Sequence, residues 1–229
     1  MPRDVGVILV AAGQGTRVGG PPKQYRQLAG VPIVVRALRP FTAHREVAQV
    51  VLVLPPADAA KPPPFLRSVA GPDIRLVAGG AERGDSVEAG LAALEPVCSI
   101  ALVHDAARPF VKADVIDAVI QEARAGSGAV AAVPVTDTVK ELAGGGHRVL
   151  RTLPREHLWR AQTPQGFPRA LLTEAYERAR RDGVKATDDA ALVERLGATV
   201  IVVPDSPRNF KITTSEDLAW AEAWVASRG

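Results

Sequence analysis

The segment VGVILVAAGQGTR, residues 5–17, places an apolar run directly before a turn of small residues. Val5–Val10 is rich in β-branched side chains and lacks polar alternation, as expected of a strand buried on both faces of a parallel sheet. Glycines at positions 13 and 15 then end the strand. Ligands of doubly wound α/β sheets bind just beyond the carboxyl ends of such strands. The segment therefore predicts a fold class and a first candidate binding loop.

Apolar runs of this kind recur along the chain and alternate with helix-like stretches. This alternation is typical of a doubly wound α/β fold with a mainly parallel sheet. Pro40 is expected to end the first helix, and Ser86 and Thr187 are the expected N-caps of two others. The expected strands are 5–10, 50–54, 74–77, 100–103, 129–133 and 199–203, and the expected helices are 32–38, 86–94, 113–125, 168–181, 188–196 and 214–227.

Residues 137–159 break the alternation. A Gly144–Gly146 turn lies between 138–142 and 148–153, which mix apolar and charged residues at short range and predict a β-hairpin outside the main sheet. An isolated two-stranded hairpin is marginal in water, so it should rest on something. A second subunit is one candidate support, and the hairpin's own domain is the other. We expect one domain over residues 1–229, with this hairpin as a dimerisation arm.

The composition excludes several classes of protein. The formal charge of the 229 residues is only +3, and the 22 Arg and 6 Lys form no run, which argues against a nucleic-acid-binding tail. A single Cys excludes a disulfide framework and a multi-cysteine zinc site. No apolar stretch approaches about 18 residues, and no signal peptide precedes the first strand, so we expect a cytoplasmic protein with no membrane partner. Scarce Asn and abundant Pro fit either a thermophile or a GC-rich genome.

The loop after the first expected strand has the features of a phosphate site. Small residues let backbone N–H groups approach an anion closely, and Arg17 and Lys23 would add two cations. The glycines do not form the GxGxxG pattern, and Gly19–Pro22 prevents a long helix from starting there, which disfavours a dinucleotide fold. The alternative is a turn with a purely structural role.

Two further segments follow expected strands. Asp105, after 100–103, is placed to hold Mg²⁺ or another divalent cation, and Arg108 could grip a phosphate with two N–H groups. The alternative is that Asp105 caps the next turn and pairs with Arg108. Gly79–Ser86, after 74–77, could meet a base or ribose through its glycines and the Ser86 hydroxyl, or could be a loop that ends in a helix cap.

Taken together, these segments resemble the 2-C-methyl-D-erythritol 4-phosphate cytidylyltransferase family of the non-mevalonate isoprenoid pathway. The resemblance spans nearly the whole chain, with its motifs in the family's order. It implies a nucleotide-diphospho-sugar transferase-like fold. The matching motifs are Ala11-Ala12-Gly13-x-Gly15-x-Arg17, Pro22-Lys23-Gln24-Tyr25, Gly79-Gly80-x-x-Arg83-x-x-Ser86-Val87, His104-Asp105-Ala106-Ala107-Arg108-Pro109, Asp137-Thr138-Val139-Lys140, Arg155, Leu158-Trp159, Gln162-Thr163-Pro164-Gln165, Thr187-Asp188-Asp189 and Asn209-Phe210-Lys211-Ile212-Thr213.

The resemblance also implies roles for some of the matching residues. Arg17 and Lys23 would stabilise the transition state, and a divalent metal would lie near Asp105. Thr138 and Arg155 would reach methylerythritol phosphate across the interface of a homodimer. The family often has an acid where this chain has Ala81, which leaves the local base contacts open. The implied CTP-binding residues are Ala11, Ala12, Gly13, Gly15, Thr16, Gly80 and Ser86, and the implied acceptor-binding residues are Asp105, Arg108, Thr138, Arg155, Thr187 and Lys211.

The implied reaction transfers CMP from CTP to methylerythritol phosphate and releases pyrophosphate. A phosphate monoester is largely ionised near neutral pH, because its second pKa is about 6, so the nucleophile needs no general base. Positioning, a divalent cation and fixed cationic side chains carry such reactions. The nearest alternative is a ribitol-5-phosphate cytidylyltransferase. More distant alternatives are a uridylyl- or thymidylyltransferase acting on a hexose phosphate and a nucleotide sensor without turnover.

Overall fold

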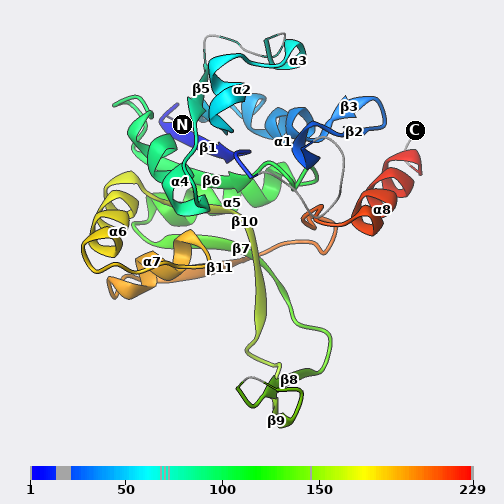
Figure 1. The fold of residues 1–229 in the computed structure, drawn as a ribbon. Helices are drawn as coiled ribbons and strands as arrows, with labels where there is room; N and C mark the ends of the chain where they lie inside the picture. Colours follow the sequence, from blue (N-terminus) through cyan, green and yellow to red (C-terminus); the bar gives the residue numbers. More distant parts are fainter. Residues whose placement is uncertain are drawn as a thin grey trace.

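The computed structural model describes residues 2–13, 22–67, 69, 71, 73–144 and 146–227. A seven-stranded sheet in the order β11-β7-β10-β6-β1-β4-β5 forms the centre (Figure 1). β10 runs antiparallel to both of its neighbours, and the remaining pairs are parallel, which confirms the predicted mainly parallel sheet. The strands are β1 Val5–Val10, β4 Val47–Leu54, β5 Ile74–Ala78, β6 Ile100–Asp105, β7 Gly128–Pro134, β10 Trp159–Pro168 and β11 Val200–Pro204.

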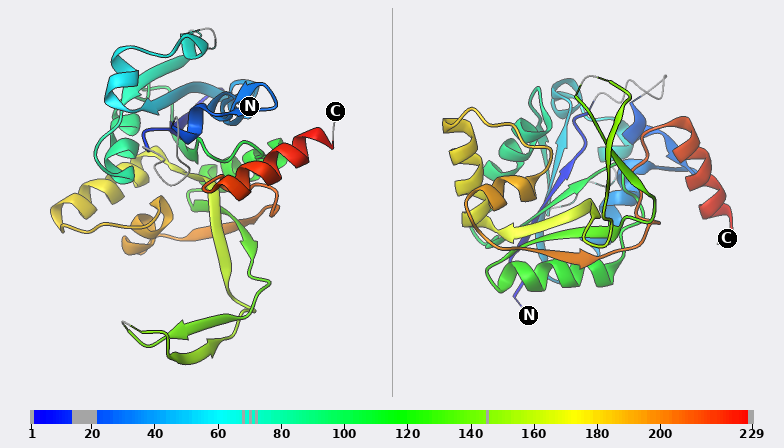
Figure 2. Two further views of the ribbon diagram at one scale, coloured as in Figure 1. Left: turned by 45° about the vertical axis from the view of Figure 1, so that its right-hand side comes forward. Right: turned by 90° about the horizontal axis from the view of Figure 1, so that it is seen from below.

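Helices cover both faces of this sheet, because the apolar side chains of its strands alternate between two cores. In β1, Val7 and Leu9 are buried in one core and Ile8 in the other. The first core contains α1 and α5, and the second contains α4, α6 and α7; Figure 2 shows α5 and α6 on opposite sides of the sheet. The helices are α1 Ile33–Thr42, α2 Pro56–Ala60, α3 Pro64–Arg67, α4 Arg83–Ala92, α5 Ala113–Arg124, α6 Arg169–Arg181, α7 Asp189–Arg195 and α8 Ser215–Ala226.

A 3-10 helix, a two-stranded ribbon and α8 lie together beside the central sheet. A short 3-10 helix, η2 Lys23–Tyr25, precedes a two-stranded ribbon of β2 Gln27–Leu28 and β3 Val31–Pro32. α8 packs its Ala221 against Leu28 of this ribbon and Ile212, in a small third core. No helix in the described part of the chain is long and apolar enough to cross a bilayer.

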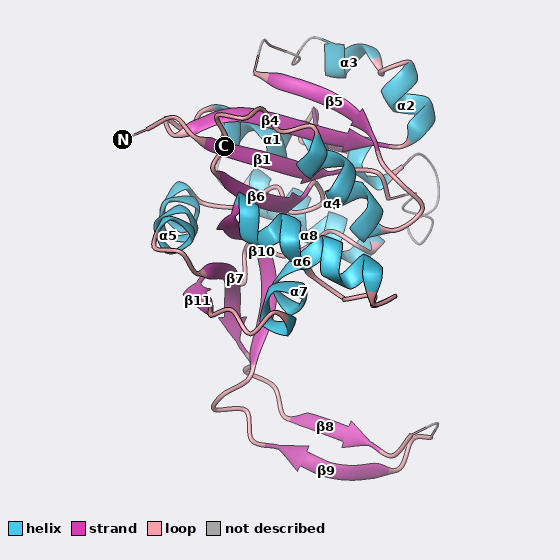
Figure 3. Cartoon of the chain, turned by 90° about the vertical axis from the view of Figure 1, so that its left-hand side faces the viewer, coloured by secondary structure: helices cyan, strands magenta, loops and turns pink. Residues whose placement is uncertain are grey.

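The predicted hairpin forms and leaves the main sheet. β8 Val139–Leu142 and β9 Val149–Leu153 pair only with each other and project away from the domain (Figure 3). The alternative that the hairpin folds back on its own domain is therefore wrong. Leu142, Val149 and Leu150 are 46%, 52% and 59% exposed. The hairpin thus presents apolar side chains to the surroundings.

β10 is the one strand of the central sheet that the sequence patterns did not predict, and the two-residue strands β2 and β3 were not predicted either. Pro164 lacks a backbone donor and Gln162–Gln165 is polar, so the segment did not have the pattern of a central strand. The register of β10 against β7 shifts between Ala161 and Gln165, which gives Pro164 a place where the regular ladder is interrupted. Tertiary pairing therefore overrides the local signal.

Three local predictions were also wrong. α1 continues through Pro40 to Thr42, where a proline near the helix end removes only one of the last hydrogen bonds. The N-cap of α4 is Glu82, which forms a capping box with Asp85, so Ser86 lies inside the helix. The N-cap of α7 is Asp188, whose carboxylate accepts from the Ala191 N–H at 3.1 Å, and Thr187 precedes it.

Candidate functional site

The carboxyl ends of β1, β4, β5 and β6 meet at one edge of the sheet, because these strands are parallel. The last residue of β1, Val10, pairs with Asp105, the last residue of β6. Ala11 continues past the strand and accepts a hydrogen bond from Gln24 through its carbonyl, at 2.9 Å from Nε2. This bond ties η2, and with it Lys23, to the loop after β1.

The Asp105 carboxylate is the centre of a cluster of cations. Lys211 Nζ lies 2.8 Å from Oδ2, Arg83 Nε lies 3.3 Å from Oδ1, and Arg108 Nε lies 3.8 Å from Oδ2. Burial by itself raises the pKa of the Asp105 carboxyl, but the charges of Lys211, Arg83 and Arg108 outweigh it and hold that pKa far below its usual range. Asp105 is therefore an anion at neutral pH. Its shortest contacts are to Lys211 and Arg83, so the alternative of a simple turn cap paired with Arg108 does not describe it.

Two cavities open beside this cluster. The β1-side cavity has a volume of about 140 Å³, and the β10-side cavity about 150 Å³. Arg83, Asp105 and Lys211 line both, so these three side chains form the wall between them. The β1-side cavity also contacts Ala11, Gly13, Lys23 and Gln24, and the β10-side cavity also contacts Arg108, Gln162, Thr163, Thr187 and Asp188.

The charge of these cavities suits an anionic ligand. Among the described lining residues, Lys23, Arg83, Arg108 and Lys211 supply four cations. The lining carboxylates are Asp105 and Asp188. Asp188 is already engaged as the cap of α7 and by Gln165 Nε2 at 2.9 Å. Fixed positive charge at the carboxyl edge of the sheet can hold two phosphorylated ligands next to each other.

His104 is a structural residue of this edge. Its ring is fully buried, with Nε2 2.9 Å from the Arg108 carbonyl and Nδ1 2.9 Å from Thr163 Oγ1. Because a carbonyl only accepts, Nε2 carries the proton and Nδ1 accepts from Thr163. Thr163 Oγ1 in turn accepts from the Asp105 N–H at 3.1 Å. Burial lowers the pKa of His104 to about 4, so the ring is neutral and fixes β6 to β10.

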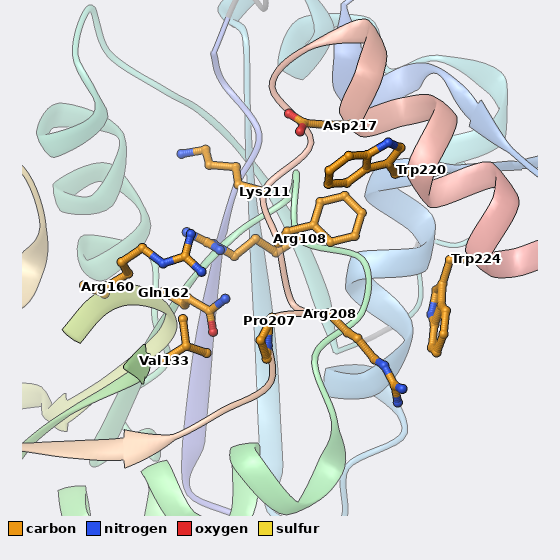
Figure 4. A pocket seen from close by; sticks show the side chains of 12 residues that line it. Arg108, Val133, Arg160, Gln162, Pro207, Arg208, Lys211, Asp217, Trp220 and Trp224 are labelled. Carbon is orange, nitrogen blue, oxygen red and sulfur yellow. The ribbon is translucent and has the colours of Figure 1, made fainter. Parts of the chain in front are cut away.

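A larger cavity of about 660 Å³ continues from the same edge toward α8. Figure 4 shows Arg108, Gln162 and Lys211 on the sheet side and Trp220 and Trp224 on α8. Trp220 is 72% exposed. The Arg208 guanidinium stacks over the Trp224 ring, 4.4 Å from its centroid. Arg108 and Lys211 line this α8-side cavity as well, so a ligand could reach both side chains through it.

The structure brings some predicted residues together. Ala11, Gly13 and Lys23 line the β1-side cavity, and Asp105, Arg108, Thr187 and Lys211 line the β10-side cavity. Ala12 lies beside Gly79 at the same edge, where a Cβ on Gly79 would come within 2.5 Å of the Ala12 Cβ. Gly15, Thr16 and Arg17 lie outside the described residues.

Other predicted residues lie apart from the cluster. Gly80 donates its N–H to Ser86 Oγ at 3.3 Å, and Ser86 is 1% exposed, so these two residues satisfy each other beside the end of β5. Thr138 and Arg155 lie in the arm, both exposed, and line none of the cavities described above. Arg155 donates to the Thr136 carbonyl at the base of the arm.

Arg83 had no role predicted from the sequence, although the residue lies in one of the motifs. Its guanidinium contacts Asp105 and also binds Asp189 with two N–H groups, at 3.1 and 2.8 Å. Asp189 lies 106 residues further along the chain. Asp189 lies in the Thr187-Asp188-Asp189 motif and Arg83 in the motif that begins at Gly79. Only the fold shows that these two motifs contact each other.

Comparisons with known proteins find relatives over nearly the whole chain. The family model described as 2-C-methyl-D-erythritol 4-phosphate cytidylyltransferase matches residues 5–227. Proteins of that name from Pelotomaculum thermopropionicum and Streptomyces coelicolor are 46% and 44% identical to this chain, over 98% and 99% of it and 95% and 87% of their own lengths. A crystal structure of the protein of that name from Thermus thermophilus superposes with a TM-score of 0.81 at 38% identity, covering 97% of this chain and 99% of the other.

Proposed function

Because this chain belongs to the 2-C-methyl-D-erythritol 4-phosphate cytidylyltransferase family, we propose that the Asp105 cluster is where it transfers CMP from CTP to 2-C-methyl-D-erythritol 4-phosphate. The chain is an enzyme of the non-mevalonate isoprenoid pathway with a nucleotide-diphospho-sugar transferase-like fold. One observation supports the site most strongly. Arg83, Asp105 and Lys211 line both of two adjacent cation-lined cavities, so phosphates bound in the two cavities would meet at these three side chains.

The reaction joins one phosphate to another. An oxygen of the acceptor's phosphate monoester attacks the α-phosphorus of CTP, the bond from that phosphorus to the β-phosphate oxygen breaks, and pyrophosphate leaves. The monoester is already largely dianionic near neutral pH, so no side chain has to remove a proton. The protein's task is to hold the two anions in line and to neutralise the charge that develops on the leaving group.

The two cavities divide this task. The phosphates of CTP would occupy the β1-side cavity, beside backbone N–H groups of the loop after β1 and the Lys23 ammonium. The acceptor would occupy the β10-side cavity, with its phosphate near Lys211 and its hydroxyl groups toward Arg108 and Thr187. The attacking oxygen and the α-phosphorus would then meet beside Lys211, which lines both cavities.

The residues present fit a divalent cation that arrives with the nucleotide. In the described part of the chain, no three His, Cys, Asp or Glu side chains converge on a point that could hold a metal. Asp105 is one ionised carboxylate, and each of its oxygens keeps a lone pair beyond its contact with Arg83 or Lys211. Mg²⁺ is usually bound by one or two carboxylates together with substrate phosphates and water. When bound, it would neutralise charge on the CTP phosphates, with Asp105 as its protein ligand.

We further propose a cytoplasmic homodimer in which each arm completes the partner's site. The arm projects from its own domain, Thr138 and Arg155 flank its two strands along the chain, and neither residue lines a cavity at the Asp105 cluster of the same chain. Exposed Leu142, Val149 and Leu150 supply apolar surface for an interface. The cytoplasm is the proposed location because CTP is a cytoplasmic metabolite.

Pyrophosphate release tests the function. The purified chain is incubated with CTP and Mg²⁺ and either methylerythritol phosphate or ribitol phosphate. We expect pyrophosphate with the first acceptor, and none when Mg²⁺ is replaced by a chelator. Faster release with ribitol phosphate would overturn the acceptor assignment. CTP binding without pyrophosphate release with any acceptor would indicate a nucleotide sensor.

A further inference from the structure

Behind the wall between the two cavities, Arg83 is held by two buried residues from other elements. Arg83 is the first residue of α4, and its Nε faces Asp105 Oδ1 at 3.3 Å. Its other two nitrogens donate to the two carboxylate oxygens of Asp189, the first residue of α7. One guanidinium therefore links the end of β6 to the start of α7.

Asp189 is fixed from a second side. Its side chain is fully buried, and the Tyr176 hydroxyl on α6 donates to Oδ1 at 2.5 Å. Burial raises the pKa of the Tyr176 hydroxyl, and the Asp189 charge raises it further, so the hydroxyl keeps its proton and acts as a donor. The carboxylate thus has one orientation, and the bidentate pair transmits that orientation to Arg83.

A role in stability alone does not account for this arrangement. Burying an ion pair removes both charges from water, and an apolar pair of similar volume often stabilises a fold as much or more. The orientation of the Arg83 guanidinium matters at its other end, where Nε meets Asp105 in the wall shared by the cavities. A planar guanidinium held at two nitrogens leaves the third with a fixed direction.

We propose that Tyr176 and Asp189 are positioning residues of the transfer reaction, holding Arg83 and, through it, the Asp105 carboxylate in the wall between the two substrate cavities. The proposal rests on the proposed function. Neither residue touches a substrate cavity at the Asp105 cluster, so both act at a distance through Arg83. Tyr176 carries no signal in the sequence, and only the packing of α6 against α7 brings it to Asp189.

A double-mutant cycle tests the proposal. Tyr176→Phe removes one hydroxyl and leaves the ring in its core. We expect kcat to fall roughly tenfold, the size of one lost hydrogen bond to a charged group, with little change in the KM for CTP. Arg83→Gln lowers kcat further. In the Arg83→Gln background, Tyr176→Phe should then have no additional effect, because the residue through which it acts is gone.

Single-turnover measurements with enzyme in excess keep slow variants measurable. Asp189→Asn keeps the size of the side chain and removes its charge, and it should lower kcat at least as much as Tyr176→Phe. Asp182→Asn is the matched control, since Asp182 joins Arg178 of α6 to Arg195 of α7 away from the cavities. We expect that control to lower the melting temperature without lowering kcat.

Two outcomes would overturn the proposal. One is an unchanged kcat in Tyr176→Phe. The other is a loss of the same factor in the wild-type and Arg83→Gln backgrounds, which would show a general effect of the mutation on the fold. Transfer by the wild-type chain is the internal standard. If the wild type does not release pyrophosphate, the proposed function fails, whereas an active wild type with an unaffected Tyr176→Phe variant removes only the positioning role.

Discussion

The Lys211 ammonium lies 2.8 Å from Oδ2 of Asp105, although 106 residues separate the two side chains. The segment that carries Lys211 is fixed to the end of β6 by a backbone bond from the Ile212 N–H to the Ala107 carbonyl, at 2.9 Å. The Lys211 side chain is a flexible four-carbon stem that ends in an ammonium group. The backbone bond next to it keeps this ammonium in the wall between the two cavities.

Lys211→Met should therefore lower kcat/KM for the acceptor by about 100- to 1,000-fold, because a charge that stabilises the transferring phosphate is lost from a confined site. Steady-state pyrophosphate release measures the change. Lys112→Met, at the start of α5, is the control and should retain wild-type activity. A Lys211→Met enzyme as active as that control would exclude Lys211 from the chemistry.

Arg17→Ala and Lys23→Ala test the cations proposed for the CTP phosphates. Removal of one well-placed stabilising group typically costs about 2.7–4 kcal/mol in the transition state. We therefore expect kcat to fall by about 100- to 1,000-fold in each variant. The Lys23→Ala variant should still fold, since the Lys23 side chain belongs to none of the described cores. An unchanged kcat in either variant contradicts the role assigned to that residue.

Complementation between inactive variants tests the shared site. In a mixture of Lys23→Ala and Arg155→Ala chains, a heterodimer has one site with Lys23 from one chain and Arg155 from the other. Random exchange should restore about a quarter of wild-type activity, because half the dimers are mixed and each has one intact site. Light scattering must show a dimer. No recovery from an exchanging mixture would place Arg155 in the site of its own chain.

His104 predicts a pH dependence of stability. Its pKa in the folded chain is about 4, below the usual 6.5, so the unfolded state binds the proton first as the pH falls. The free energy of unfolding is therefore not reduced by His104 above pH 6.5. As the pH falls from 6.5 toward 4, that free energy decreases by at most about 1.4 kcal/mol per pH unit. Denaturant unfolding at several pH values measures this slope. His104→Gln should have a shallower slope between these pH values, and a slope equal to that of the wild type would contradict this assignment.

The local sequence was informative wherever a pattern depends on neighbouring residues. Apolar β-branched runs predicted β1, β6 and β7 because strands buried on both faces need no polar alternation. The same reasoning failed at Gln162–Gln165, where pairing with β6 and β7 makes a strand of a polar, proline-containing segment. The predicted starts of α4 and α7 were wrong by one to a few residues. Glu82 and Asp188 are the N-caps, whereas the nearby hydroxyl residues Ser86 and Thr187 were predicted.

The sequence by itself determined the doubly wound sheet, the hairpin outside it and the motif residues at strand ends, since each depends on chemistry within a few residues. Tertiary structure alone decided which of these residues meet. Asp105 gains Lys211 and Arg83 from segments far along the chain, and Arg83 gains Asp189 and Tyr176 from α7 and α6. Their separation in sequence carries no distance information, because the order of strands and the packing of helices on both faces set those contacts.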